Sequence, residues 1–233
     1  MDKKISIILS TYNEATIIEK TINELFKTIN NCEIVLVDDN SNDGTFEKAS
    51  LIKNKNLKVI SRKSRGLASA FLLGMINTSG DLIGWTDSNM PQLTHHFNEM
   101  IKKLDEYDIV LLSRYVEGGG DQRSKIRIVS SQIINFICRL ILGSEIKDYT
   151  SGIFLMKRDT LKNGVPIAYG HGEFFIEFLY KIKKSNKNIK IAELPYIQPP
   201  DAEGSKTTSS ILRFFTLGLS YLIRIIISRF RKN

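Results

Sequence analysis

The stretch ISIILSTYNEATIIEKTINELFKTINNCEIVLVDD, residues 5–39, decides the fold. It opens with a β-branched, apolar run over residues 5–10, after which apolar side chains recur at helical spacing between residues 14 and 29. A second apolar run over residues 34–37 stops at an acidic pair. Both runs are apolar on both faces, as in strands that helices cover from two sides. The stretch therefore predicts two strands of a mostly parallel sheet, joined by a helix.

The same alternation continues along the chain, with no internal repeat. It predicts strands over residues 57–60, 82–85 and 109–112 and helices after Gly44 and over residues 66–76 and 93–104. We therefore expect an α/β fold in which residues 1–206 form one domain around a mostly parallel central sheet. Residues 207–233 are expected to form an appended amphipathic helix.

Composition is that of a globular domain with a buried core, because 42% of the 233 residues are hydrophobic and 25% are charged. Cys32 and Cys138 are far apart and belong to no CxxC or Cys-His grouping, so we expect reduced, buried thiols. The apolar run after Lys4 is too short for a signal peptide and lacks a small-residue cleavage site. We therefore expect the domain to face the cytoplasm.

Polar side chains follow four of the predicted strands at the point where each strand ends. They are residues 12–14, 38–39, 87–89 and 113–115. In a sheet of this kind ligands bind beyond the carboxyl ends of the strands, so these groups are expected to line one crevice.

Several motifs resemble those of a known family. They are Ser-Thr-Tyr-Asn-Glu (10–14), Val-Asp-Asp-Asn-Ser-Asn-Asp-Gly-Thr (37–45), Gly-Leu-Ala-Ser-Ala (66–70), Gly-Asp-Leu-Ile-Gly-Trp-Thr-Asp-Ser-Asn (80–89) and Ser-Arg-Tyr-Val-Glu-Gly-Gly-Gly (113–120). In this order they resemble family 2 glycosyltransferases, and within that family dolichyl-phosphate mannose synthases and their bacterial polyprenyl-phosphate relatives. The resemblance covers nearly the whole chain and implies a GT-A fold and a nucleotide-sugar donor.

The resemblance also implies which residues bind the donor, a GDP- or UDP-sugar. Tyr12 and Glu14 would lie beside the base and the ribose, and Asp39 would accept hydrogen bonds from them, as an acidic residue after a strand commonly does. Lys206 would close over the diphosphate. The full implied donor set is Ser10, Tyr12, Glu14, Val37, Asp39, Ser88, Asn89, Arg114 and Lys206.

A divalent cation, Mg²⁺ or Mn²⁺, is implied beside the diphosphate, where it would neutralise the charge of the leaving group. Asp87 would be its first ligand. The family's second carboxylate is replaced here by Asn89, whose neutral carbonyl oxygen should bind the cation more weakly. Gln92 is close to the position of a further family ligand, displaced by one because Pro91 intervenes.

A polyprenyl phosphate acceptor needs cations more than it needs a base, because its phosphate is already anionic at pH 7. The resemblance implies that Arg114 and Arg127 hold this phosphate. Asp87, Arg114, Arg127 and Lys206 are thus the expected catalytic residues for transfer of mannose or glucose with inversion. Two alternatives remain open. One is a saccharide acceptor, which would need a carboxylate base near Asp87 or Asp148, and the other is a nucleotide-sugar-binding protein without catalysis.

The C-terminal segment from residue 205 onward carries six basic residues and no acid, in a chain whose net charge is +8. Between Arg213 and Arg231 the polar residues are 3, 4, 4, 4 and 3 positions apart, which makes one stripe along an otherwise apolar helix. Such a broad apolar face argues against nucleic acid as the partner.

Three interpretations of this helix remain. It could lie on an anionic membrane surface at the cytoplasmic face, an arrangement that fits its cationic stripe. It could span the membrane, or it could pack on its own domain or across a homodimer. We expect the first, because contact with a membrane suits a lipid acceptor.

Overall fold

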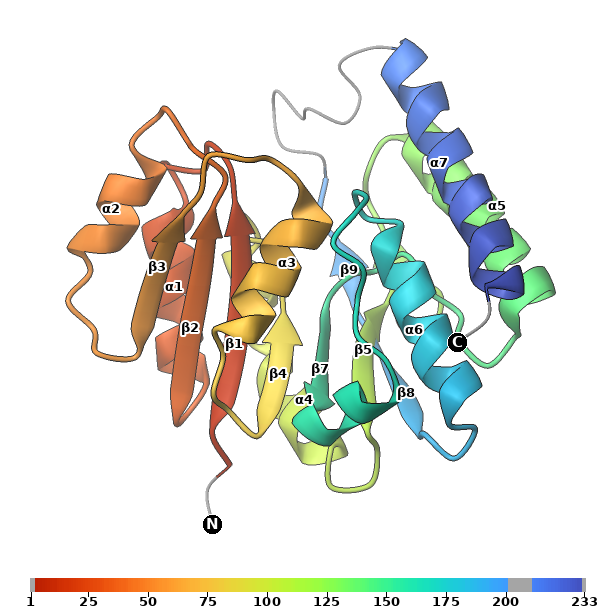
Figure 1. The fold of residues 1–233 in the computed structure, drawn as a ribbon, viewed down its shortest axis with the longest axis horizontal. Helices are drawn as coiled ribbons and strands as arrows, with labels where there is room; N and C mark the ends of the chain where they lie inside the picture. The colour runs from red at the N-terminus through yellow and green to blue at the C-terminus, as the bar shows by residue number, and fades with distance from the viewer. Residues whose placement is uncertain (1–2, 201–210, 232–233) are drawn as a thin grey trace.

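The computed structural model describes residues 3–200 and 211–231, with side chains in the last helix from residue 216 onward. A seven-stranded sheet crosses the molecule in the order β3-β2-β1-β4-β7-β5-β8 (Figure 1). Neighbouring strands are parallel, except that β7 is antiparallel to both β4 and β5. The strands are β1 (Ile5–Thr11), β2 (Cys32–Asp38), β3 (Leu57–Ser61), β4 (Leu82–Trp85), β5 (Ile109–Ser113), β7 (Phe154–Lys157) and β8 (Ile191–Pro195).

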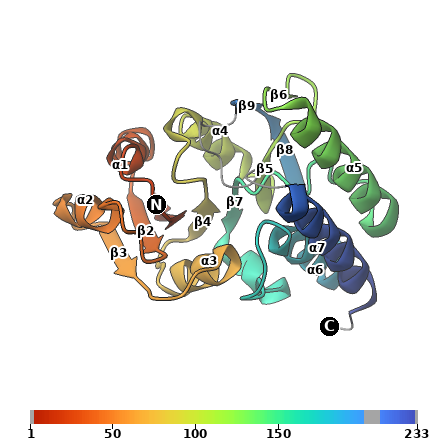
Figure 2. The same ribbon diagram turned by 90° about the horizontal axis from the view of Figure 1, so that it is seen from above.

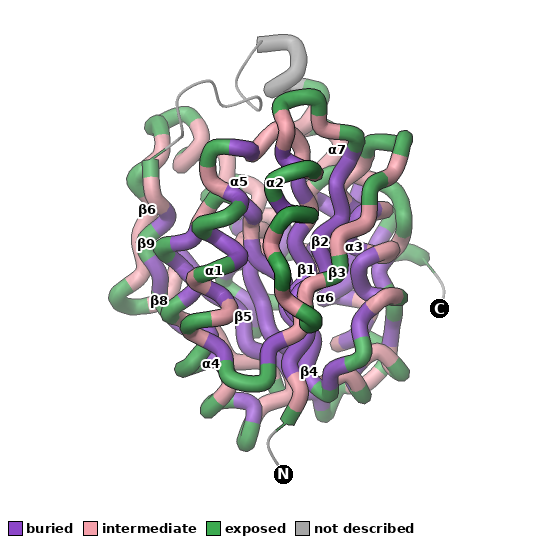
Figure 3. The backbone as a smooth tube through the Cα atoms, turned by 90° about the vertical axis from the view of Figure 1, so that its left-hand side faces the viewer, coloured by how far each residue is buried: buried purple, intermediate pink, exposed green. Residues whose placement is uncertain are grey.

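Helices cover both faces of this sheet (Figure 2). Side chains of α1 (Ile18–Thr28), α2 (Thr45–Leu51) and α4 (His96–Lys103) share one core cluster with the sheet. Those of α3 (Leu67–Ile76) and α6 (Phe174–Ser185) belong to the cluster on the other face. Two further helices, α5 (Lys125–Leu142) and α7 (Ile211–Phe230), lie side by side next to α6 in both views. Figure 3 shows the buried strands enclosed between these layers.

All five predicted strands are present, which confirms the mostly parallel α/β fold. The sequence interpretation missed β7 and β8, and with them the antiparallel strand at the centre of the second half of the sheet. β7 has only four residues, too few to show a periodicity. Its first residue, Phe154, is fully buried and stacks on Phe175 of α6, with ring centroids 5.1 Å apart. The predicted helix over 93–104 begins later, at His96, because Pro91–Leu93 form a separate 3₁₀ turn, η1.

Part of the polar stripe of α7 faces inward, as in a helix that packs on its own domain. Arg224 and Ser228 are only 8% and 4% exposed, whereas Phe230 is 78% exposed. Arg224 donates to Glu177 of α6 at 2.8 Å, and Arg231 pairs with the other oxygen of the same buried carboxylate. The stripe thus supplies the countercharge that a buried carboxylate needs. Among the described helices, none combines the length and the apolarity needed to cross a bilayer.

Candidate active site

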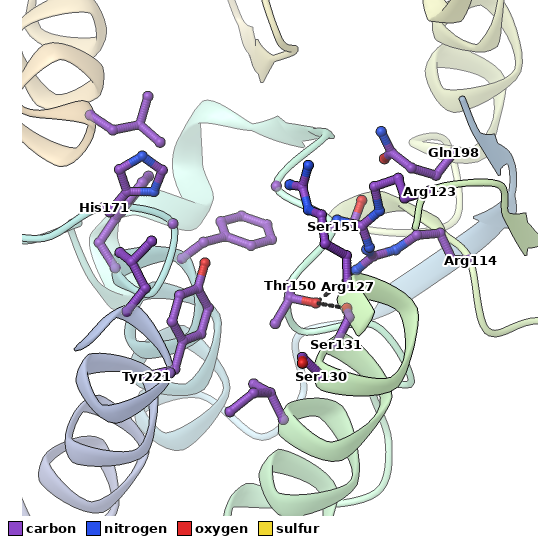
Figure 4. Close-up of a pocket in the computed structure, with 18 of the residues that line it drawn as sticks. Arg114, Arg123, Arg127, Ser130, Ser131, Thr150, Ser151, His171, Gln198 and Tyr221 are labelled. Atoms are coloured by element: carbon purple, nitrogen blue, oxygen red, sulfur yellow. Dashed lines mark hydrogen bonds between the residues drawn. The ribbon is translucent and has the colours of Figure 1, made fainter. Parts of the chain in front are cut away.

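A cavity of about 640 Å³ lies beyond the carboxyl ends of β4 and β5 and reaches between α5 and α7 (Figure 4). It brings together Asp87, Arg114 and Arg127, which the sequence interpretation placed in one site. One end of the cavity is polar, and the end between the two helices is apolar. The apolar lining from these helices is Ile133, Ile134, Ile137, Leu217, Leu219 and Leu222.

Arg114 is held by the protein itself. Its Nε and Nη2 donate to the two carboxylate oxygens of Asp148 at 2.8 and 2.7 Å, and Nη2 also donates to Thr150 Oγ1 at 2.7 Å. Burial opposes the charged form, yet the ion pair with Asp148 keeps the pKa of Arg114 above its ordinary value. Arg114 therefore contributes a fixed positive charge to the cavity wall.

Arg123 adds a third guanidinium that the sequence interpretation missed. Its Nε and Nη2 donate to Asp121 at 2.9 and 2.5 Å, and these bonds outweigh burial and lower the pKa of Asp121. The pair forms where β6 (Gly120–Asp121) joins β9 (Ile197–Gln198) in a two-stranded parallel sheet. The sequence feature that could have identified Arg123 is its position four residues before Arg127, close to the start of a helix. We refer to Arg114, Arg123 and Arg127 as the arginine cluster.

Asp87 follows β4 and lines the cavity, and the residue is half-buried. Burial raises the pKa of its carboxyl group, and the arginine cluster opposes that shift. Within the described part of the chain, no residue donates a hydrogen bond to this carboxylate. Its oxygens are therefore available to an incoming ligand.

Asp87 fits the part of a cation ligand, whereas the other two predicted ligands lie outside the cavity. Asn89 is exposed, and its amide donates to Glu14 Oε1 at 3.4 Å, while Gln92 is exposed on η1. The described residues contain no group of three His, Cys, Asp or Glu side chains that could hold a metal alone. A cation that bridges a diphosphate takes most of its ligands from phosphate and water, so one carboxylate suits Mg²⁺ or Mn²⁺ here.

A second group of predicted residues lies at the ends of β1 and β2. Asp39 accepts hydrogen bonds from Arg62 Nε at 2.5 Å and from the Gly66 amide at 2.9 Å. The guanidinium of Arg65 lies over the ring of Tyr12, 3.6 Å from its centroid. The segment 62–66 thus contacts both predicted donor residues, Asp39 and Tyr12. The sequence interpretation did not predict the part played by its two arginines.

Three of the remaining predicted donor residues, Ser10, Val37 and Ser88, are more deeply placed. Ser10 Oγ is buried and has no hydrogen-bond partner among the described residues. The Val37 side chain is fully buried in the core. Ser88 is also buried, and its carbonyl accepts a hydrogen bond from Thr21 at 2.7 Å. Lys206 lies outside the described residues. The donor-binding roles of these residues stay predictions.

Residues 6–164 match the family described as Glycosyl transferase family 2. The chain belongs to glycosyltransferase family 2. Among its relatives, the dolichol-phosphate mannosyltransferase of Pyrococcus furiosus is 35% identical over 210 residues, 83% of this chain and 56% of that protein. The dolichol-phosphate mannosyltransferase of Saccharomyces cerevisiae is 26% identical over 223 residues, 90% of this chain and 82% of that protein. The chain thus spans little more than half the length of the Pyrococcus relative.

Solved structures bear out the GT-A fold. Glucosyl-3-phosphoglycerate synthase from Mycobacterium tuberculosis, in complex with Mn²⁺, UDP and phosphoglyceric acid, matches with a TM-score of 0.75 and 17% identity, over 99% of this chain and 80% of that one. The same enzyme with Mn²⁺, UDP-glucose and phosphoglyceric acid also gives 0.75, over 99% and 81%. At this identity the likeness concerns the fold alone.

Proposed function

We propose that this glycosyltransferase moves one hexose, mannose or glucose, from a GDP- or UDP-sugar onto a polyprenyl phosphate, with inversion at the anomeric carbon. The amphipathic cavity carries the proposal. Asp87 and the arginine cluster lie at one end, and apolar side chains of α5 and α7 line the other. A phosphate on an isoprenoid chain has the same division into an anionic head and an apolar tail. The two dolichol-phosphate mannosyltransferases among the relatives support this acceptor.

A saccharide acceptor suits this cavity less well. Its hydroxyl would need a positioned base, because a sugar hydroxyl is not ionised at neutral pH. That base was expected near Asp87 or Asp148, and Asp148 itself is fully buried and binds Arg114 through both oxygens. A lipid phosphate is already ionised and needs no such base.

In the proposed reaction the protein orients two phosphates. The arginine cluster holds the acceptor phosphate, one oxygen of which attacks the anomeric carbon in line with the departing diphosphate. Asp148 keeps Arg114 in its orientation, so that its charge needs no reorganisation during the reaction. Asp87 would hold Mg²⁺ or Mn²⁺, which when bound neutralises charge on the leaving diphosphate. Lys206 is proposed to close over that diphosphate.

We also propose that α5 and α7 dock on an anionic membrane surface. Their exposed apolar residues form two stripes, which we call the apolar stripes: Ile126, Val129, Ile133, Phe136 and Leu140 on α5, and Leu219, Ile223, Ile226, Ile227 and Phe230 on α7. Both helices carry basic residues and no acidic one. Ile133 and Leu219 belong to the stripes and also line the cavity, so a lipid on this surface could enter the site directly.

Labelled transfer tests the reaction. Membranes that contain the protein are incubated with labelled GDP-mannose or UDP-glucose and then extracted with organic solvent. We expect label in a lipid from which mild acid releases the sugar. Label in a water-soluble polymer would instead indicate a saccharide acceptor, and donor binding without any transfer would indicate a non-catalytic protein.

Arg127→Ala is expected to lower this lipid labelling roughly tenfold to a hundredfold, the effect of losing one charge-assisted hydrogen bond to the phosphate. Lys102→Ala is the control, because Lys102 is an exposed cation on α4, away from the cavity lining and from the two docking helices. Equal labelling by the two variants would contradict the assignment of Arg127 to the acceptor.

Vesicle binding tests the docking surface. Ile223→Asp places a charge in the apolar stripe of α7, where Ile223 is 48% exposed. We expect it to weaken co-sedimentation with phosphatidylglycerol vesicles at least about tenfold, since burial of one such side chain contributes about 1.5–3 kcal/mol. Ile76→Asp changes an isoleucine on α3 that is even more exposed, at 70%, and should have no effect. Binding that is insensitive to Ile223→Asp would argue against docking through this face.

A further inference from the structure

A second pocket, of about 490 Å³, lies against α5. It is separate from the active-site cavity, since Ile133 alone appears among the described lining residues of both. It is nevertheless close to the active site, because the ring of Tyr115 lines it and also contacts the guanidinium of Arg114, 5.2 Å from the ring centroid. The described lining residues are Tyr115, Gln132, Ile133, Asn135, Phe136 and Arg139. The reaction proposed above does not use this pocket.

Arg139 gives this pocket a positive charge that the described residues do not balance. None of the described lining residues is acidic, and no carboxylate in the described part of the chain pairs with Arg139. Gln132 adds an exposed amide with two N–H donors. Asn135 is occupied, because its buried Nδ2 donates to the Ser131 carbonyl at 2.9 Å and to Thr150 Oγ1 at 2.7 Å. The polar side of the pocket therefore suits an anion.

The apolar side of the pocket belongs to the proposed docking surface. Ile133 and Phe136 are 53% and 60% exposed, and both are members of the apolar stripe of α5. When this stripe enters the membrane interface, the half-buried Arg139 beside it loses water as well. A guanidinium that loses water needs a countercharge. The described residues supply none, whereas phospholipid phosphates are present at that depth of the interface.

We propose that this pocket binds the headgroup phosphate of an anionic membrane phospholipid, a lipid other than the acceptor. The inference rests on the docking surface proposed above and adds a specific site to it. The planar fork of Arg139 binds two phosphate oxygens, and the Gln132 amide donates to the same headgroup. The acyl chains pass over Ile133 and Phe136 into the bilayer. A phospholipid bound in this way holds α5 on the membrane beside the active site.

Titration with a soluble phospholipid tests the inference without vesicles or turnover. The probe is dihexanoyl-phosphatidylglycerol below its critical micelle concentration, and NMR follows the side-chain amide of Gln132. We expect saturable binding that Arg139→Ala weakens about tenfold, the effect of one lost charge-assisted hydrogen bond. Arg139→Lys, which keeps the charge but not the fork, should recover part of the loss. Inorganic phosphate has no acyl chains and should bind at least about tenfold more weakly than the lipid.

Lys125→Ala is the matched control, because it removes the same charge from an exposed position on the same helix, outside the pocket lining. Equal weakening by Lys125→Ala and Arg139→Ala would overturn the inference, since it would show only a diffuse attraction between charges. Inorganic phosphate that binds as tightly as the lipid would also overturn it. So would a Gln132 signal that responds to Arg127→Ala but not to Arg139→Ala, because the lipid would then occupy the active-site cavity.

Failure of the proposed docking surface gives a different result. Vesicle binding that is insensitive to Ile223→Asp, together with binding of the soluble lipid that depends on Arg139, would reject that surface and leave the phospholipid site standing. Vesicle binding that is sensitive to Ile223→Asp, without any Arg139-dependent binding of the soluble lipid, would reject the phospholipid site alone.

Discussion

Asp87→Asn is expected to lower the rate of sugar transfer about a thousandfold while the protein stays folded. Asparagine keeps the shape of the side chain and removes the negative charge that would hold Mg²⁺ or Mn²⁺. The described residues offer no other carboxylate that lines the cavity, so nothing in that part of the chain can replace it. Each tenfold in rate corresponds to about 1.36 kcal/mol, and neutralisation of a leaving diphosphate is an effect of several kcal/mol.

The matched control for this prediction lies beside the opposite end of the same strand. Asp81 immediately precedes β4, at the end opposite Asp87, where its carboxylate accepts a hydrogen bond from the Lys4 amide. Asp81→Asn should leave transfer close to the wild-type rate. Rates are measured over a series of Mg²⁺ and Mn²⁺ concentrations with a saturating donor. A rate for Asp87→Asn within about threefold of that for Asp81→Asn would remove Asp87 from the reaction.

The sequence predicted the first half of the fold well because that half is regular. Strands such as residues 34–37 are continuous apolar runs, and the helices between them show clear periodicity. The second half was harder because pairing over long distances decides it. β7 is short and inserts antiparallel between β4 and β5, and its burial beside α6 cannot be read from four residues.

Contacts between residues far apart in the chain also explain why the sequence predicted the spacing of α7 but not its orientation. Its spacing predicted one polar stripe, and that stripe exists. Its orientation depended on a partner far away in the chain, the buried Glu177 of α6. A buried carboxylate binds the nearest arginines, so Arg224 lies inward while apolar side chains such as Phe230 are exposed. The periodicity of a helix predicts which residues share a face, but the direction of that face depends on the charges of the elements packed against it.

In the active site, the resemblance located residues that follow strand ends, and Asp87 and Arg114 do line one cavity. It gave no sign of Arg62, Arg65 or Arg123, because these occupy loops whose course the motifs do not describe. It also assigned Arg114 to a phosphate without foreseeing the buried pair with Asp148. That pair is formed by residues 34 positions apart, and only the folded chain shows that they meet.

Glu177→Gln is expected to destabilise the protein by about 3–5 kcal/mol, because it removes the anion from a buried ion pair and leaves the buried Arg224 without its countercharge. The free energy of unfolding is measured by urea denaturation. Glu145→Gln is the control, since Glu145 pairs with Lys183 at 2.8 Å but is 68% exposed, and such a pair contributes less than about 1 kcal/mol. Equal midpoints for the two variants would mean that the pairing of α7 with α6 adds little to stability.

Removal of the Glu177 charge should also affect the active site, because Arg224 donates a hydrogen bond to the Tyr169 carbonyl, next to residues 170–172. Without Glu177, Arg224 has no acidic partner among the described residues, and both the α7 contact and the carbonyl contact should loosen. We therefore expect Glu177→Gln to raise the KM for the sugar nucleotide at temperatures well below its unfolding midpoint. Glu145→Gln should not. A destabilised Glu177→Gln protein with an unchanged KM would show that the cavity lining at His171 and Gly172 keeps its shape without support from α7.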